Sequence, residues 1–274
     1  MSQLSPTTER TARRVRHEAK RRLLQVRDVS RITPKMTRVV LTGDELCGFV
    51  SAAHDDHVKL FFPRPGQDKP ELPTQTPNGP VYAEGVTPPA ARDYTPRRYD
   101  AAGNTLTIDF VLHGEGPATA WAAQARPGQC LGVGGPRGSF IVPDDFDWYL
   151  LAGDESALPA IGRRLEELAA TARAFVVAEV GDAGEEQRFT SRAKVETHWL
   201  HRDGTAGSQS LLHDAIAALK LPPGEGYAWV AAEAATAKAL RRHLVDERGL
   251  RKDRVKAAAY WKQGAVAVHE TYDD

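Results

Sequence analysis

Apolar and polar side chains alternate along the first half of the chain. Residues 57–62 place Val58, Leu60 and Phe62 on one face, and residues 106–113 extend the same pattern over the longest stretch. Successive side chains of a strand point to opposite faces, so each run predicts a strand with one buried face. Residues 23–29 and 36–41 predict two more strands. The six or so strands up to residue 140, without strong helices between them, predict a six-stranded antiparallel β-barrel.

The pattern changes after residues 143–147, which we interpret as a linker. Apolar runs at 148–152, 174–180, 227–232 and 255–260 then alternate with segments of helical period at 158–170, 211–219 and 236–248, and 194–200 predicts another strand. Such alternation is typical of a parallel α/β sheet with helices on both faces. We therefore expect a flexible segment or short helix at 1–20, a barrel domain at 21–142 and an α/β domain at 148–274.

A long proline-rich stretch precedes the most informative motif. Residues 63–91 contain eight prolines and little apolar periodicity, which predicts a loop. Loops of this length are usually functional or disordered. The stretch therefore either covers a ligand or is disordered.

The motif that follows is Arg92-Asp93-Tyr94-Thr95-Pro96-Arg97. An arginine fork fits phosphate oxygens two at a time, a tyrosine ring offers a stacking face, and a threonine hydroxyl can donate or accept one hydrogen bond. A phosphate-bearing aromatic cofactor needs all three. Pro96 cannot donate to a sheet, so the strand should be an edge strand or bulged there. The alternative is a basic edge strand with a buried tyrosine.

Two strand ends offer candidate phosphate sites. The strand at 106–113 runs into Gly114-Glu115-Gly116-Pro117, and a helix should open at Ala118-Thr119, so unpaired N–H groups and the helix dipole point at the turn. Gly153-Asp154-Glu155-Ser156 ends the first α/β strand, where Ser156 should cap a helix with Pro159 in its first turn. Residues 128–138 lack the G-x-G-x-x-G spacing, because Arg137 replaces the third glycine, and predict a strand and a tight turn.

Composition excludes several classes of protein. The formal net charge is zero, which gives no reason to expect a nucleic-acid partner. The sequence has neither a membrane-spanning apolar run nor a signal-peptide core, so we expect a cytoplasmic protein without membrane insertion. Cys47 and Cys130 cannot supply four thiolates to an iron–sulfur cluster, and we expect two free, mostly buried thiols. Residues 54–57 (HDDH) lack a third spaced ligand, which indicates a polar turn rather than a metal site.

These motifs occur in the order typical of one family. R-x-Y-T-x-R at 92–97, FVLHGEGPATAWA at 110–122 and YWKQG at 260–264 resemble the siderophore-interacting family of ferric-siderophore reductases, which are ferredoxin-reductase-like flavoproteins. The resemblance covers residues 23–264. It implies an FAD-binding barrel followed by an α/β domain that binds NAD(P)H and meets the siderophore.

The resemblance also implies roles for single residues. Tyr94 would pack on the isoalloxazine, and Thr95 would lie near its reactive nitrogen. Arg92 and Arg97 would neutralise the diphosphate or the ribityl region of FAD, and which arginine contacts which region is left open. The residues implied for the flavin edge are Phe110, Val111 and His113, and those implied to supply backbone and hydroxyl donors to the diphosphate are Gly116, Pro117, Ala118 and Thr119.

The implied NAD(P)H residues Gly153, Asp154, Glu155 and Ser156 include two acids where a phosphate would approach. They would weaken binding unless they turn away or bind ribose hydroxyls. Lys59 and Lys262 are implied to hold the anionic siderophore beside the flavin. The alternative for both lysines is simple solvation at strand positions.

The implied function is an FAD-dependent reductase of ferric siderophores that releases iron as Fe(II). Electrons come from NAD(P)H or from a ferredoxin-like donor, and the flavin carries the chemistry, so no side chain need act as acid, base or nucleophile. We expect a monomer without a bound metal of its own. A carrier of ferric siderophore or flavin without turnover, and a general flavin- or ferredoxin-linked reductase, are the alternatives.

Overall fold

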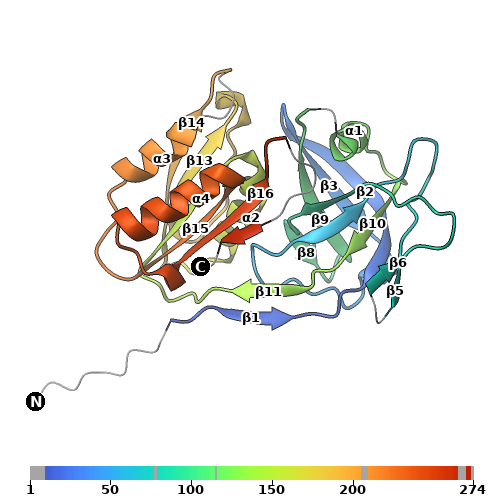
Figure 1. Cartoon of the computed structure of the whole chain (residues 1–274), viewed down its shortest axis with the longest axis horizontal. Coiled ribbons are helices and arrows are strands. Elements are labelled where there is room, and N and C mark those ends of the chain that lie inside the picture. The colour runs from blue at the N-terminus through green and yellow to red at the C-terminus, as the bar shows by residue number, and fades with distance from the viewer. Residues whose placement is uncertain (1–9, 77–78, 115, 205–208, 265–269, 273–274) are drawn as a thin grey trace, which may run out of the picture.

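The computed structural model describes residues 10–76, 79–114, 116–204, 209–264 and 270–272. Two main sheets lie side by side, one formed by the N-terminal half of the chain and the other, with its helices, by the C-terminal half (Figure 1).

The first sheet is antiparallel and curled, with seven strands rather than the six expected. Its order is β7-β4-β10-β2-β3-β9-β8, which leaves β7 at one edge, as Pro96 predicts. The long β2 carries register shifts between Val26 and Asp28 and between Arg31 and Thr33, and such bulges bend a strand and increase its twist. The strands are β2 (Arg21–Thr33), β3 (Met36–Thr42), β4 (Val58–Phe61), β7 (Ala91–Tyr94), β8 (Arg98–Asp100), β9 (Thr105–Val111) and β10 (Cys130–Gly134).

The core of this half consists of the positions that the alternation pointed inward. Val58, Leu60, Leu106 and Ile108 are fully buried. The 3-10 turn η1 (Asp44–Leu46) adds a buried leucine, and helix α1 (Pro117–Ala123) packs Trp121 against this core.

A two-stranded ribbon corrects the expectation for the N-terminus. Residues 13–16 form β1 (Arg13–Arg16), which pairs antiparallel with β11 (Gly138–Ile141), so this part is neither a flexible segment nor a helix. The prediction failed because a strand with both faces largely exposed has no apolar period, and β11 supplies its hydrogen bonds. Residues 1–9 lie outside the described residues.

The second sheet has the order β14-β13-β12-β15-β16-β17. The first five strands are parallel, as predicted, and the sixth pairs antiparallel with β16. Its strands are β12 (Trp148–Gly153), β13 (Arg173–Val180), β14 (Lys194–His201), β15 (Gly226–Glu233), β16 (Val255–Trp261) and β17 (Glu270–Tyr272).

Helices cover both faces of this sheet. Helix α2 (Leu158–Glu167) packs on one face, and α3 (Gln209–Ala218) and α4 (Ala234–Arg242) on the other. A π-helical turn, η4 (His243–Glu247), continues α4, and 3-10 turns η2 (Glu155–Ala157), η3 (Ala183–Glu185) and η5 (Lys252–Arg254) connect elements. No helix among the described residues is long and apolar enough to cross a membrane.

The proline-rich stretch at 63–91 is largely a loop, as expected. Part of it forms a small ribbon of β5 (Thr74–Thr76) and β6 (Gly79–Val81). Leu72 lies against Gly132, where a Cβ would come within 2.4 Å of the leucine side chain. The loop is therefore attached to the barrel at this point by an apolar contact that periodicity did not reveal.

Both cysteines are free thiols, as expected, but the expected burial is wrong. Cys47 is exposed and Cys130 is half-buried, because each lies at the end of an element and not inside the core.

Polar contacts join the two halves. Thr33 donates its hydroxyl proton to Glu185 at 2.5 Å, and the Lys35 amide donates to the same carboxylate at 3.0 Å. Arg163 on α2 donates to the Ser51 hydroxyl at 2.7 Å and to the Pro96 carbonyl at 3.0 Å. Pro96 belongs to the sequence motif, so α2 directly supports the chain where that motif leaves β7.

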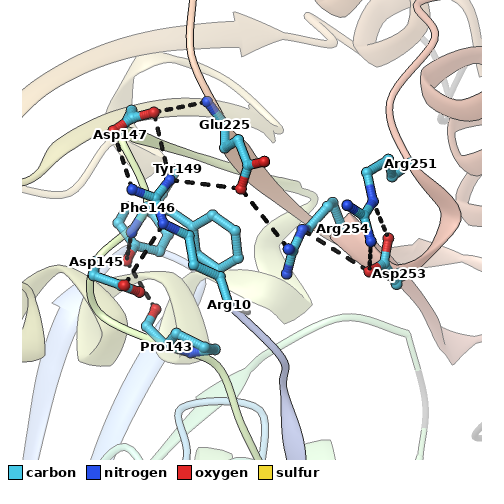
Figure 2. A network of polar contacts seen from close by, with 10 residues as sticks. All are labelled: Arg10, Pro143, Asp145, Phe146, Asp147, Tyr149, Glu225, Arg251, Asp253 and Arg254. Carbon is cyan, nitrogen blue, oxygen red and sulfur yellow. Dashed lines mark hydrogen bonds and ion pairs between the residues drawn. The ribbon is translucent and has the colours of Figure 1, made fainter. Parts of the chain in front are cut away.

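A further polar network surrounds the connection at 143–147 (Figure 2). Arg10 lies within 3.4 Å of Asp147, 3.6 Å of Asp145 and 3.8 Å of Glu225, and its guanidinium stands over the Phe146 ring. The N-terminal segment thus contacts both the connection and the loop before β15.

Candidate functional site

The motif at 92–97 lies where edge strand β7 ends. Val58 pairs with Tyr94, and the chain leaves the sheet at Thr95. Tyr94 is half-buried, with its ring 4.5 Å from the Phe110 ring between centroids. Burial raises the pKa of the Tyr94 hydroxyl, and the nearby positive charge of Arg92 opposes the shift. The Tyr94 ring therefore packs against Phe110 and keeps some exposed surface.

The two arginines of the motif have different neighbours. Arg97 is 8% exposed and donates to Glu166 of α2 at 3.0 and 2.5 Å. This contact lowers the pKa of Glu166. Arg92 is half-buried and donates one bond, at 2.7 Å, to the Ala91 carbonyl, and within the described part of the chain no carboxylate pairs with it. Arg92 is thus the better placed of the two to bind an anion, whereas Arg97 joins the two halves.

The turn before α1 provides open space. A Cβ built on Gly114 or Gly116 would meet nothing within 4 Å, and Gly116 precedes the helix without a side-chain cap. Pro117, Ala118 and Thr119 open the helix as predicted. The Thr119 hydroxyl, however, donates to the His113 carbonyl at 2.9 Å, so it closes the turn and has no second proton to donate.

The residues expected at the flavin edge differ in exposure. Phe110 is fully buried and supports Tyr94 from the core. Val111 is half-buried and packs toward the α/β half, and His113 is exposed. Of the three, only Val111 and His113 have exposed surface.

The turn at 153–156 satisfies its own polar groups. Asp154 accepts from the Ser156 amide at 2.9 Å and from the Ser156 hydroxyl at 2.5 Å, so Asp154 is the cap and the expectation that Ser156 caps the helix is wrong. Glu155 pairs with Arg202. The two acids thus turn to partners within the α/β half, one of the two arrangements that the sequence allowed. Pro159 lies in the first turn of α2, as predicted.

Gly153 has a packing role. A Cβ there would stand 2.0 Å from the Ala231 carbonyl oxygen and 2.5 Å from the Ala157 side chain. The glycine is therefore required where β12 meets its neighbours, whatever binds at the turn.

The two lysines singled out from sequence lie in different halves. Lys59 on β4 pairs with Asp93 on β7 at 2.7 Å, and its side chain is 43% exposed. Lys262 is exposed and follows β16, directly after Trp261. Trp261 is 41% exposed, and its indole N–H donates to Asp154 at 2.7 Å.

A buried polar cluster behind the motif was missed from sequence. Asp55 forms an ion pair with Lys256 at 2.6 Å and accepts from the Tyr260 hydroxyl at 2.7 Å. Burial alone would raise the pKa of Asp55, but Lys256 and its other partners lower it to about 2. Lys256 offered a signal, since it is a single charge inside the apolar run at 255–259.

Comparison with known proteins covers nearly the whole chain. Residues 25–140 match the siderophore-interacting FAD-binding domain, and residues 146–264 match the siderophore-interacting protein model. An NADPH-dependent ferric-chelate reductase of Escherichia coli is 39% identical over 93% of this chain and 98% of its own length. The ferric vibriobactin reductase ViuB of Vibrio cholerae is 36% identical over 87% of this chain and 89% of its own.

Solved structures give the same picture. A siderophore utilization protein from T. fusca is 42% identical and superimposes with a TM-score of 0.87 over 94% of this chain and 98% of that protein. A ferredoxin reductase of carbazole 1,9a-dioxygenase, at 16% identity and a TM-score of 0.63, covers 86% of this chain and 68% of that one, and shares the fold alone. The fold is ferredoxin-reductase-like.

Proposed function

The chain belongs to the siderophore-interacting protein family, and from this premise we propose that it is an FAD-dependent reductase that releases iron from ferric siderophores. The observation that carries the proposal is the match of residues 25–140 to an FAD-binding domain that contains the Arg92–Tyr94–Thr95 arrangement. Electrons come from NAD(P)H, with NADPH as the first candidate because a relative is named for it.

The residues present fit FAD. Tyr94 offers a ring that is half-buried and supported by Phe110, Arg92 offers most of a guanidinium fork, and the turn at Gly114 and Gly116 is open. We assign the diphosphate to Arg92 and the backbone at 116–119, and the isoalloxazine to Tyr94 and Thr95. Val111 and His113 contribute its edge.

We propose that the two halves of the chain bind different ligands. Residues 21–142 hold FAD, and residues 148–274 hold the nicotinamide nucleotide and contact the siderophore. Lys59 and Lys262 attract the anionic ferric complex, Lys59 in competition with its Asp93 partner. Because both proposed sites are built from one chain, a monomer suffices.

When bound, FAD would supply the redox chemistry between the nicotinamide and Fe(III). The protein's own residues would bind FAD, orient it and cover its ring. Arg92 offsets diphosphate charge, Tyr94 covers the ring, and Arg97 with Glu166 joins the barrel to α2 beside the motif. Iron leaves because the oxygen ligands of a siderophore hold Fe(II) more weakly than Fe(III).

The test is an anaerobic titration of the purified protein, reconstituted with FAD, using NADPH and separately NADH. We expect bleaching of the flavin absorbance and then reoxidation by a ferric catecholate, with Fe(II) trapped by a chelator. A protein that takes up no FAD contradicts the proposal. Reduction without reoxidation by the chelate indicates a carrier or a general reductase, and failure of both nucleotides indicates a ferredoxin-like donor.

A further inference from the structure

Two histidines and a glutamate meet on the face of the second sheet opposite α2. His213 lies on α3, and His243 and Glu247 are the first and last residues of the π-helical turn η4, which continues the neighbouring helix α4 (Figure 1). One imidazole nitrogen of each histidine and one carboxylate oxygen of the glutamate lie within 4.8 Å of one another. Among the described residues this is the one group of three histidine, cysteine or acidic side chains with such spacing.

The contacts within this cluster supply both nitrogen and oxygen ligands. Nδ1 of His243 lies 2.8 Å from Oε2 of Glu247, and the rings of His213 and His243 are 4.7 Å apart between centroids. The hydrogen bond from His243 lowers the pKa of Glu247, so the glutamate is ionised at neutral pH. The cluster therefore offers two imidazoles and one negatively charged carboxylate.

His243 is incompletely paired for a buried residue. It is 5% exposed, and its Nε2 has no hydrogen-bond partner in the described part of the chain. Most buried polar atoms in native proteins are hydrogen-bonded, and the exceptions include atoms that contact a bound water or ion. The hydrogen bond with Glu247 therefore does not by itself account for this imidazole.

The two elements that carry the cluster are held together beside it. Arg248 donates to the Ile216 carbonyl at 2.8 Å and to the Leu219 carbonyl at 2.9 Å, around the C-terminal end of α3. Arg248 directly follows Glu247, so these bonds fix η4 against the helix that bears His213. π-Helical turns are rare and are frequently found at functional sites.

We propose that His213, His243 and Glu247 bind one divalent transition-metal ion, which links α3 to η4. Two imidazoles with one carboxylate suit zinc, ferrous iron and neighbouring first-row ions, whereas magnesium and calcium prefer oxygen ligands. Water completes the coordination, because three protein ligands leave a position open. The site requires neither FAD nor reductase activity, so it goes beyond the proposed function and does not rest on it.

Metal binding requires a small movement of His213. Tetrahedral zinc with bonds of about 2.0–2.2 Å holds its ligand atoms roughly 3.3–3.5 Å apart, which is closer than the 4.8 Å within which the three atoms lie. The His213 side chain is 38% exposed, and its Nδ1 lies 3.5 Å from exposed Asp214. Such an exposed contact contributes little, so the imidazole can turn toward the buried pair at small cost.

The first experiment is a zinc titration of the full chain, prepared without an affinity tag because tag histidines bind metal. Competition with a chromophoric chelator should give one zinc site per chain in the wild type. His213→Gln leaves the hydrogen bond between His243 and Glu247 in place and should weaken zinc binding at least about tenfold, since loss of a residue that merely supports a metal ligand already costs about 10–100-fold.

His198→Gln is the matched control. It removes an imidazole that lies 2.9 Å from the Glu196 carboxylate, in a pair that no third ligand joins among the described residues. This variant should keep the wild-type affinity for zinc. Equal affinity in the wild type, His213→Gln and His198→Gln, or a wild type that binds no zinc, overturns the proposal.

The second experiment tests the choice of metal and the link between the helices. Zinc should raise the melting temperature of the wild type, because an ion that binds only the folded state stabilises it, and should not raise that of His213→Gln. Fe²⁺, tested anaerobically, should bind more weakly than zinc, and Mg²⁺ should not displace zinc. Displacement by Mg²⁺, or zinc stabilisation that persists in His213→Gln, overturns the site. A chain that binds no FAD overturns the proposed function and leaves these expectations unchanged.

Discussion

Arg92 and Arg97 belong to the same motif, but their partners separate them. Arg97 is buried against Glu166, so binding of a diphosphate there would require breaking an ion pair between the two halves. Arg92 donates one hydrogen bond to the carbonyl of the neighbouring Ala91. These partners favour Arg92 over Arg97 as the proposed anion-binding residue.

We predict that Arg92→Ala weakens FAD binding by at least tenfold, since a charge-assisted contact contributes about 1.5–3 kcal/mol. Arg97→Ala is the matched control and should keep FAD binding but lower the melting temperature. Titration of apo-protein with FAD, followed by quenching of flavin fluorescence, measures both. Loss of FAD binding by Arg97→Ala with retention by Arg92→Ala would reverse the assignment.

His54 is a buried histidine without a partner for its Nε2 among the described residues, and its ring lies edge-on to Trp229 at 5.2 Å. Burial, with the nearby positive charge of Arg164, lowers the pKa of His54 well below its ordinary value. The unfolded chain therefore takes up this proton first as pH falls.

It follows that His54 stabilises the fold above about pH 6.5, and that this contribution is lost as pH falls below 6.5 toward the folded pKa, by about 1.4 kcal/mol per pH unit. Urea unfolding between pH 7.5 and 5 should show this dependence of the unfolding free energy on pH in the wild type. In His54→Phe the slope should be smaller by up to about 1.4 kcal/mol per pH unit, which is the contribution of one proton. Equal slopes in the two proteins would contradict the prediction.

At the scale of elements, the stretch at 63–91 contacts the barrel at few points. Leu72 packs on Gly132, but β5 and β6 pair only with each other in the described sheets. An isolated two-stranded ribbon is marginally stable in water.

We predict that this stretch is mobile without ligand. Amide hydrogen exchange on the apo-protein should show little protection over 64–69 and 82–88, in contrast to β9 and β12. Strong protection throughout the stretch in apo-protein would show that the barrel alone orders it.

At the scale of the whole molecule, the proposed substrate groups come from different halves. Lys59 lies on a barrel strand and Lys262 follows the parallel strand β16. The chain has a formal net charge of zero, so attraction of an anionic chelate depends on such local charges and not on the overall field.

Replacing both lysines with methionine should weaken binding of an anionic ferric catecholate more than tenfold, because two partly exposed charge pairs contribute about 1 kcal/mol each. The defect should shrink with added salt, since screening already reduces the wild-type attraction. Single-turnover reoxidation of reduced protein by this chelate, and by a neutral ferric chelate as control, measures the effect. Equal slowing with both chelates, or loss of FAD, would assign the lysines to the cofactor or the fold.

The sequence by itself determined the two-part architecture and much of its cores. Alternation at 57–62 and 106–113 and apolar runs at 148–152 and 174–180 are local consequences of which faces are buried, so they can be read without knowing the neighbours. The order of motifs along the chain likewise identified the family, because it depends on residue types at fixed spacing.

The tertiary structure alone decided which polar groups meet. The pairing of Arg97 with Glu166, of Lys256 with Asp55, and of β1 with β11 joins residues far apart in the chain. No periodicity encodes such contacts, since each partner is locally an ordinary polar residue. Burial then makes these contacts consequential: a buried charge requires a partner, and that partner fixes which groups remain available to a ligand.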